Sequence, residues 1–138
     1  MSTLVVLDAS AGVEIVLRTT RGEALLARLE SSEAVVIAPS HFVVEAAGAL
    51  RRLERTGEVG RDRARFALAR LTQLVTPAAA DELIVDAWAL RDNLTVADAV
   101  YVVLARRSGA ALMSTDERML RDLRQFRGSG AEFSGTEG

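Results

Sequence analysis

The stretch LVVLDAS at residues 4–10 decides the fold of this chain, because it joins an apolar strand directly to a carboxylate. Four consecutive apolar residues, two of them β-branched, are typical of a short strand that is covered on both faces. Asp8 ends this run, and a helical pattern follows through about Arg18. A buried strand that leads at once into a helix is the repeating unit of an α/β domain.

The same alternation continues to the end of the chain. Further buried strands are predicted over residues 34–37 and 110–114, with a weaker one over residues 74–76. Helical patterns cover residues 21–30, 40–55, 61–74, 78–91, 95–107 and 116–124. This order predicts an α/β fold in which a short parallel sheet is flanked by helices on both faces. We expect one domain over residues 1–126 and a disordered, Gly-rich tail over residues 127–138.

The composition excludes several kinds of chemistry. The 138 residues include no cysteine, no lysine and a single histidine, His41, and all 17 basic residues are arginine. There can be no disulfide, no thiol nucleophile, no cysteine-ligated metal and no lysine-based Schiff base or P-loop. If the protein is an enzyme, its reactive groups are therefore expected among its 19 carboxylates.

The net charge of −2 hides an uneven distribution. Residues 51–70 and 106–127 are rich in arginine, which is typical of solvated helix faces but also allows a local patch that contacts phosphates. No apolar run approaches the roughly 20 residues that a membrane span needs, and no secretory leader is predicted. We expect a cytoplasmic protein.

Four carboxylates stand in unusual places. Asp8 and Asp116 follow predicted strands, and the carboxyl ends of parallel strands are where ligands bind in such sheets. Glu45 and Asp98 lie in helices so apolar that most of their faces must be buried. Each acid alone has a structural explanation, such as a helix cap or an arginine partner. Together, four acids without a nearby lysine suggest a hard cation, Mg²⁺ or Mn²⁺, which prefers oxygen ligands.

This arrangement resembles a known family. The segments VVLDAS (residues 5–10), TVADAVYVVLA (residues 95–105) and MSTDERML (residues 113–120), with Glu45 between them, are similar to the PIN domain. The size and the segment around Asp98 resemble the VapC-type toxins of toxin–antitoxin pairs most. The resemblance extends over residues 3 to about 124, and the acidic quartet of the family falls on Asp8, Glu45, Asp98 and Asp116.

The resemblance implies an endoribonuclease that depends on Mg²⁺ or Mn²⁺ and is neutralised by a cognate antitoxin protein. Asp8, Asp98 and Asp116 would ligate the main metal ion, while Glu45 would hold a second ion or orient the attacking water. Ser10 and Thr115 would support these carboxylates through hydrogen bonds. The implied partners are an RNA substrate, the antitoxin and a second copy of the chain in a homodimer.

Three other functions remain open from the sequence. A receiver or haloacid-dehalogenase-like phosphotransfer domain also places an aspartate after its first strand, but both need a lysine that this chain lacks. The second is a module that binds RNA or protein on the same fold without catalysis, and the third is a PIN-type ribonuclease that is not a toxin. We expect His41 at a helix start without a catalytic role, and Trp88 and Tyr101 in the core.

Overall fold

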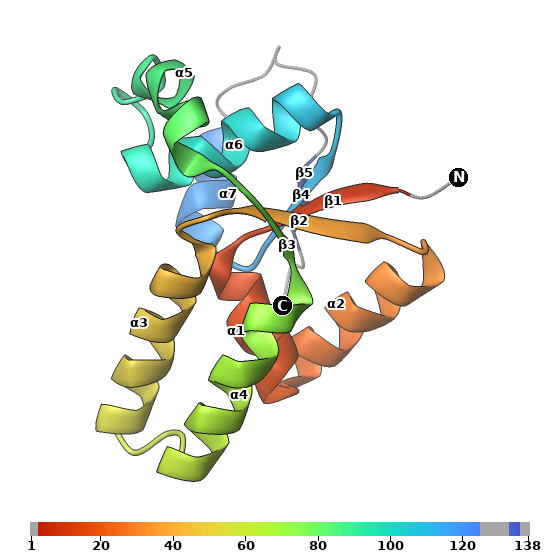
Figure 1. Cartoon of the computed structure of the whole chain (residues 1–138), viewed down its shortest axis with the longest axis vertical. Coiled ribbons are helices and arrows are strands. Elements are labelled where there is room, and N and C mark those ends of the chain that lie inside the picture. The colour runs from red at the N-terminus through yellow and green to blue at the C-terminus, as the bar shows by residue number, and fades with distance from the viewer. Residues whose placement is uncertain (1–2, 125–132, 136–138) are drawn as a thin grey trace.

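The computed structural model describes residues 3–124 and 133–135, which form a parallel sheet with helices on both faces (Figure 1). Every neighbouring pair of strands is parallel, and the order across the sheet is β3-β2-β1-β4-β5. The strands are β1 (Leu4–Leu7), β2 (Val35–Pro39), β3 (Thr76–Ala78), β4 (Ala111–Ser114) and β5 (Phe133–Gly135). The predicted α/β fold is therefore confirmed.

Two groups of helices cover the sheet. On one face lie α1 (Ala9–Leu17), α2 (Thr20–Ser31), α3 (Phe42–Arg55) and α4 (Arg61–Leu74) (Figure 1). On the other lie the 3₁₀ turn η1 (Ala80–Leu83), α5 (Ile84–Trp88) and α6 (Val96–Ser108). The last helix, α7 (Glu117–Arg124), follows β4. Within the described part of the chain, no helix is long and apolar enough to cross a membrane.

The burial of the central strands in the core explains why their sequences are unbroken apolar runs. Val6 and Leu7 of β1 and Leu112 of β4 are fully enclosed, as strands covered by helices on both faces require. Close packing extends to the backbone between α1 and α2. A Cβ added to Gly22 would lie 1.9 Å from the carbonyl oxygen of Glu14, so only glycine fits there.

The structure differs from the sequence-based expectation at three places. The helix predicted over residues 78–91 is a 3₁₀ turn followed by the five-residue α5. Trp88, expected in the core, is 57% exposed, because so short a helix turns this face outward, and the guanidinium of Arg91 lies 4.8 Å above its ring. Tyr101 is buried as predicted. Third, β5 is a strand within the segment that was predicted to be a disordered tail. The rest of residues 127–138 lies outside the described residues. The domain boundary at residue 126 stays a prediction.

The strand order defines where a ligand would bind. The chain runs from β1 outward to β2 and β3, and then returns to place β4 on the other side of β1. The connections leave β1 and β4 in opposite directions at this point, and in such sheets ligands bind beyond the carboxyl ends of the two strands. Asp8 directly follows β1, and Asp116 lies two residues beyond β4.

Candidate active site

Asp8 is a buried carboxylate whose two oxygens both accept hydrogen bonds. Its side chain caps α1: Oδ1 accepts from the amide of Ala11 at 3.0 Å and from the hydroxyl of Ser10 at 2.7 Å. Oδ2 accepts from the hydroxyl of Ser114. Burial raises the pKa of Asp8 to about 6, against the effect of these hydrogen bonds, and the charge of Asp116 adds to the rise. Asp8 therefore caps the first helix, as its structural explanation required. The same carboxylate also experiences the negative charge of Asp116.

A hydroxyl network joins the ends of β1 and β4. Ser114 Oγ accepts from the amide of Asp116 at 3.0 Å and lies 3.3 Å from Ser10 Oγ. Ser10 Oγ accepts in turn from the amide of Thr115 at 3.1 Å. Ser10 therefore hydrogen-bonds to Asp8, whereas Thr115 contributes its backbone amide to this network. Ser114 was missed by the sequence reasoning, although a serine that ends an apolar strand was a signal of such a role.

Asp98, in the first turn of α6, and Asp116, just before α7, both contact Arg118. The Thr95 hydroxyl caps α6 by accepting from the amide of Asp98 at 3.1 Å, and Asp116 Oδ1 accepts from the amide of Met119 at 3.2 Å. Burial raises the pKa of Asp98, and the negative charges of Asp116 and Glu45 raise it further. The guanidinium of Arg118 opposes this effect, since its Nη2 lies 3.4 Å from Asp98 Oδ2 and 4.0 Å from Asp116 Oδ2.

Glu45 is held by two aromatic side chains instead of the arginine that the sequence suggested. The hydroxyl of Tyr101 donates to Glu45 Oε1 at 2.7 Å, and His41 Nε2 lies 3.2 Å from the same oxygen. His41 Nε2 is also 3.2 Å from the carbonyl oxygen of Ala97. Both neighbours can only accept, so Nε2 carries a proton. Burial and the adjacent carboxylate raise the pKa of Tyr101, which keeps its hydroxyl a donor.

The described residues bring the four predicted acids to one end of the sheet but do not close them around a point. Asp8 and Asp116 share the hydroxyl network, and Asp98 reaches Asp116 through Arg118. Among residues 3–124 and 133–135, no three acidic, histidine or cysteine side chains have ligand atoms gathered as in a bound metal site. The donors are all carboxylate and hydroxyl oxygens, which suits a hard cation and not zinc.

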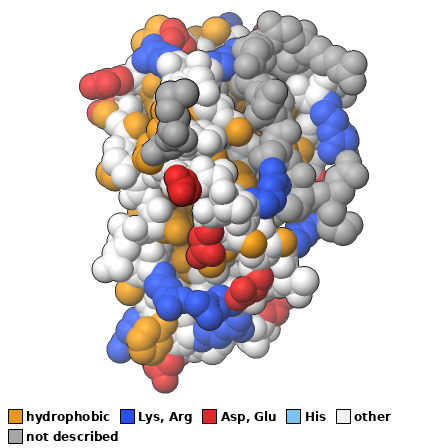
Figure 2. Space-filling model, turned by 90° about the vertical axis from the view of Figure 1, so that its right-hand side faces the viewer, with side chains coloured by type: hydrophobic (Ala, Val, Ile, Leu, Met, Phe, Trp, Pro, Cys, Tyr) orange, Lys and Arg blue, Asp and Glu red, His pale blue; other side chains and the backbone are white. Residues whose placement is uncertain are grey.

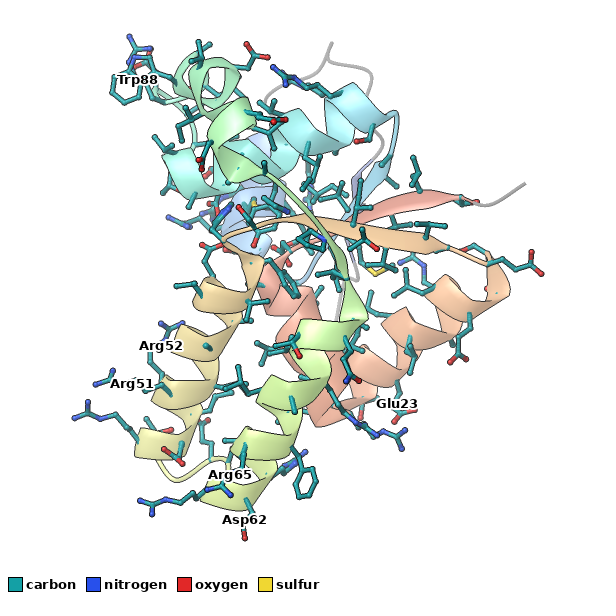
Figure 3. All side chains as sticks on the ribbon, in the orientation of Figure 1. Glu23, Arg51, Arg52, Asp62, Arg65 and Trp88 are labelled. Atoms are coloured by element: carbon teal, nitrogen blue, oxygen red, sulfur yellow. The ribbon has the colours of Figure 1, made fainter. Side chains whose placement is uncertain are left out.

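The arginines of residues 51–70 are not paired with these acids, whereas Arg118 of residues 106–127 contacts two of them. Figure 3 places Arg51, Arg52 and Arg65 toward the far end of the α3–α4 pair, where they point into solvent. Figure 2, which views the molecule from the right-hand side of Figure 1, shows a band of arginine side chains near the same end, with acidic side chains at its edge. Arg107 is engaged in an ion pair with Asp86. A groove of about 260 Å³ between α3 and α4 is lined by Ala47, Leu50, Arg51, Glu54, Arg61, Ala64, Arg65 and Leu68.

Comparison with known proteins places this geometry in a family. The PIN domain profile matches residues 5–124. The chain is 41% identical over 119 residues to ribonuclease VapC3 of Mycobacterium tuberculosis, covering 85% of each protein. The fold is similar to the VapBC2 complex of Rickettsia felis bound to a promoter DNA fragment, at TM-score 0.69, 8% identity and 98% and 100% coverage of this chain and that one. It is also similar to M. tuberculosis VapC20, a toxin that cleaves the sarcin–ricin loop, at TM-score 0.60, 21% identity and 85% and 93% coverage. This chain belongs to the PIN domain family and is a homologue of the VapC ribonucleases.

Proposed function

We propose that this protein is an endoribonuclease that depends on Mg²⁺ or Mn²⁺ and acts as the toxin of a toxin–antitoxin pair. The observation that carries the proposal is the buried Asp8 at the carboxyl end of β1, opposite Asp116 at the end of β4. Two mutually repelling acids at a topological switch point are the arrangement expected of a cation site. The homology to VapC ribonucleases supports RNA as the substrate.

The residues present fit a divalent cation. Asp8, Asp98 and Asp116 offer carboxylate oxygens from three elements, and Glu45 offers one more from the first turn of α3. A bound divalent ion would lower the pKa of a water and stabilise negative charge at the attacked phosphate. The chain's own part is orientation: Ser10 and Ser114 fix both oxygens of Asp8, while Tyr101 and His41 fix Glu45. We propose that Glu45 holds a second ion or orients the attacking water.

The test is RNA cleavage with the purified protein. We expect cleavage of cellular RNA in millimolar Mg²⁺ or Mn²⁺, its loss in EDTA, and its loss in Asp8→Asn with the fold intact by circular dichroism. Asp92→Asn, an exposed aspartate in a turn, is the control and should cleave like the wild type. Cleavage by Asp8→Asn at the wild-type rate would refute the mechanism. RNA binding without cleavage would instead assign the fold to a non-catalytic module.

The toxin role needs a cellular test. Induced expression should arrest growth in the wild type and not in Asp8→Asn, and co-expression of a small adjacent open reading frame should restore growth. Cleavage without growth arrest would identify a PIN-type ribonuclease that is not a toxin. The homodimer is also a proposal: Ile84, Val85 and Trp88 leave α5 with large exposed apolar side chains. Light scattering should give twice the 14.8 kDa chain mass if the dimer forms.

A further inference from the structure

Arg118 is a basic side chain in direct contact with the proposed metal ligands. It lies in the first turn of α7, two residues after Asp116, so the turn of the helix carries its guanidinium back over the acids. Its Nη2 atom lies 3.4 Å from Asp98 Oδ2 and 4.0 Å from Asp116 Oδ2. One cationic group therefore bridges carboxylates from α6 and from the start of α7.

The two sides of this contact differ in exposure. The side chains of Asp98 and Asp116 are 17% and 33% exposed and are attached to capped helix ends, which restrain them. The Arg118 side chain is 57% exposed and long, and ion pairs of this kind contribute little net stability. Arg118 can therefore leave the acids at low cost, while the acids cannot follow it.

We infer that Arg118 is a resident counter-cation of the acidic site, which a divalent cation displaces and which then contacts the substrate phosphate. The inference rests on the proposed function, since it assumes that the acids bind a divalent ion. A divalent cation bound to the same two carboxylates would repel the guanidinium, so binding of one opposes binding of the other. A released arginine two residues from Asp116 stays at the mouth of the site, where an arginine fork suits a phosphate.

The inference predicts effects of opposite sign in one variant. Removing the guanidinium should tighten binding of the cation, because the competitor is gone, and weaken binding of RNA, because a phosphate contact is gone. A purely structural role would weaken both. The matched control is Arg121→Gln, which removes the same charge from an exposed arginine one turn later in α7.

The first measurement is calorimetric titration of the full chain with MnCl₂ without RNA. Arg118→Gln should bind Mn²⁺ about fivefold more tightly than the wild type, the scale of one exposed ion pair, and Arg121→Gln should stay within about twofold. Equal affinity for Mn²⁺ in Arg118→Gln and the wild type would overturn the inference. If the wild type itself bound no Mn²⁺, the proposed function would fail, and the two failures are thus distinguishable.

The second measurement is the KM for an RNA that the wild type cleaves, followed against KCl concentration. In Arg118→Gln the KM should rise about tenfold. The slope of log KM against log salt should decrease by about 1, which is the contribution of one phosphate contact. The KM of Arg121→Gln should change less than half as much. A KM for Arg118→Gln that is unchanged, or that changes no more than in the control, would overturn the second half of the inference.

Discussion

Replacing Asp8 by asparagine should stabilise the metal-free protein at neutral pH, although it should abolish cleavage. Asparagine has the same shape, its Oδ1 can accept from Ser10 and Ala11, and its amide can donate to Ser114. What it removes is a buried charge whose pKa is raised from 3.8 to about 6, chiefly by burial. That shift of about two units corresponds to about 3 kcal/mol against the folded, ionised state.

The sign of the pH dependence follows from the proton count. Between pH 4 and 6, the folded wild type still holds a proton on Asp8 that the unfolded chain has released, so its stability falls as pH rises. The asparagine variant lacks this group, and the titrations of the other residues largely cancel in the difference. The gap in free energy of unfolding between the two proteins should therefore grow from near zero at pH 4 to about 3 kcal/mol above pH 6.

Urea unfolding in EDTA across this pH range is the assay. Thermal melts should show a midpoint about 10 °C higher for the variant at pH 7.5. Adding Mg²⁺ should stabilise the wild type and narrow the gap, because the ion binds only the folded protein that keeps its carboxylate. A gap that is the same at pH 4 and pH 7.5 would show that desolvation of Asp8 does not govern its ionisation. A variant less stable than the wild type at pH 7.5 would contradict the burial argument.

Three further predictions concern the contacts that support the site and the packing of the helices. Ser114→Ala should lower the free energy of unfolding by about 1–3 kcal/mol and slow cleavage, since a buried carboxylate oxygen and an amide each lose a partner, whereas Thr115→Val should change neither by much. Tyr101→Phe removes the hydroxyl that donates to the α3 carboxylate and should reduce cleavage about tenfold, with a melting curve close to that of the wild type. Gly22→Ala should lower the free energy of unfolding in urea by more than about 2 kcal/mol, because its Cβ would meet a backbone carbonyl. Gly48→Ala, which has open space around its position in α3, should leave this free energy unchanged or raise it by up to about 1 kcal/mol. Equal effects of the two substitutions would refute the packing argument.

The fold was predictable because its two central strands, β1 and β4, are almost entirely buried. Runs such as residues 4–7 and 110–114 are short, apolar and without helical period, which is typical of covered strands. The prediction of one helix over residues 78–91 was wrong for a different reason. The apolar residues of this segment recur at helical spacing, but only part of them pack inward, so Trp88 lies on the surface while Ala87 is enclosed. Periodicity indicates which residues share a face and not whether that face is covered.

The acids of the candidate site were found from the sequence, but their partners were not. Asp8, Glu45 and Asp98 stand out because a carboxylate inside an apolar run needs an explanation. The hydrogen-bond donors come from elsewhere in the chain: Ser114 lies 106 residues from Asp8, and Tyr101 lies 56 residues from Glu45. Such pairs form only through the strand order and the packing of α6 against the sheet, which local patterns do not contain.

The separation between Asp8 and Ser114 also decides when the site exists. A chain that has not yet placed β4 beside β1 lacks the hydroxyl that fixes Asp8 and lacks Asp116 altogether. The candidate site is therefore complete only when β4 lies beside β1, and any opening that detaches β4 takes it apart. The proposed activity would thereby be coupled to completion of the fold: a fragment released before β4, or a molecule opened between β1 and β4, has no assembled site.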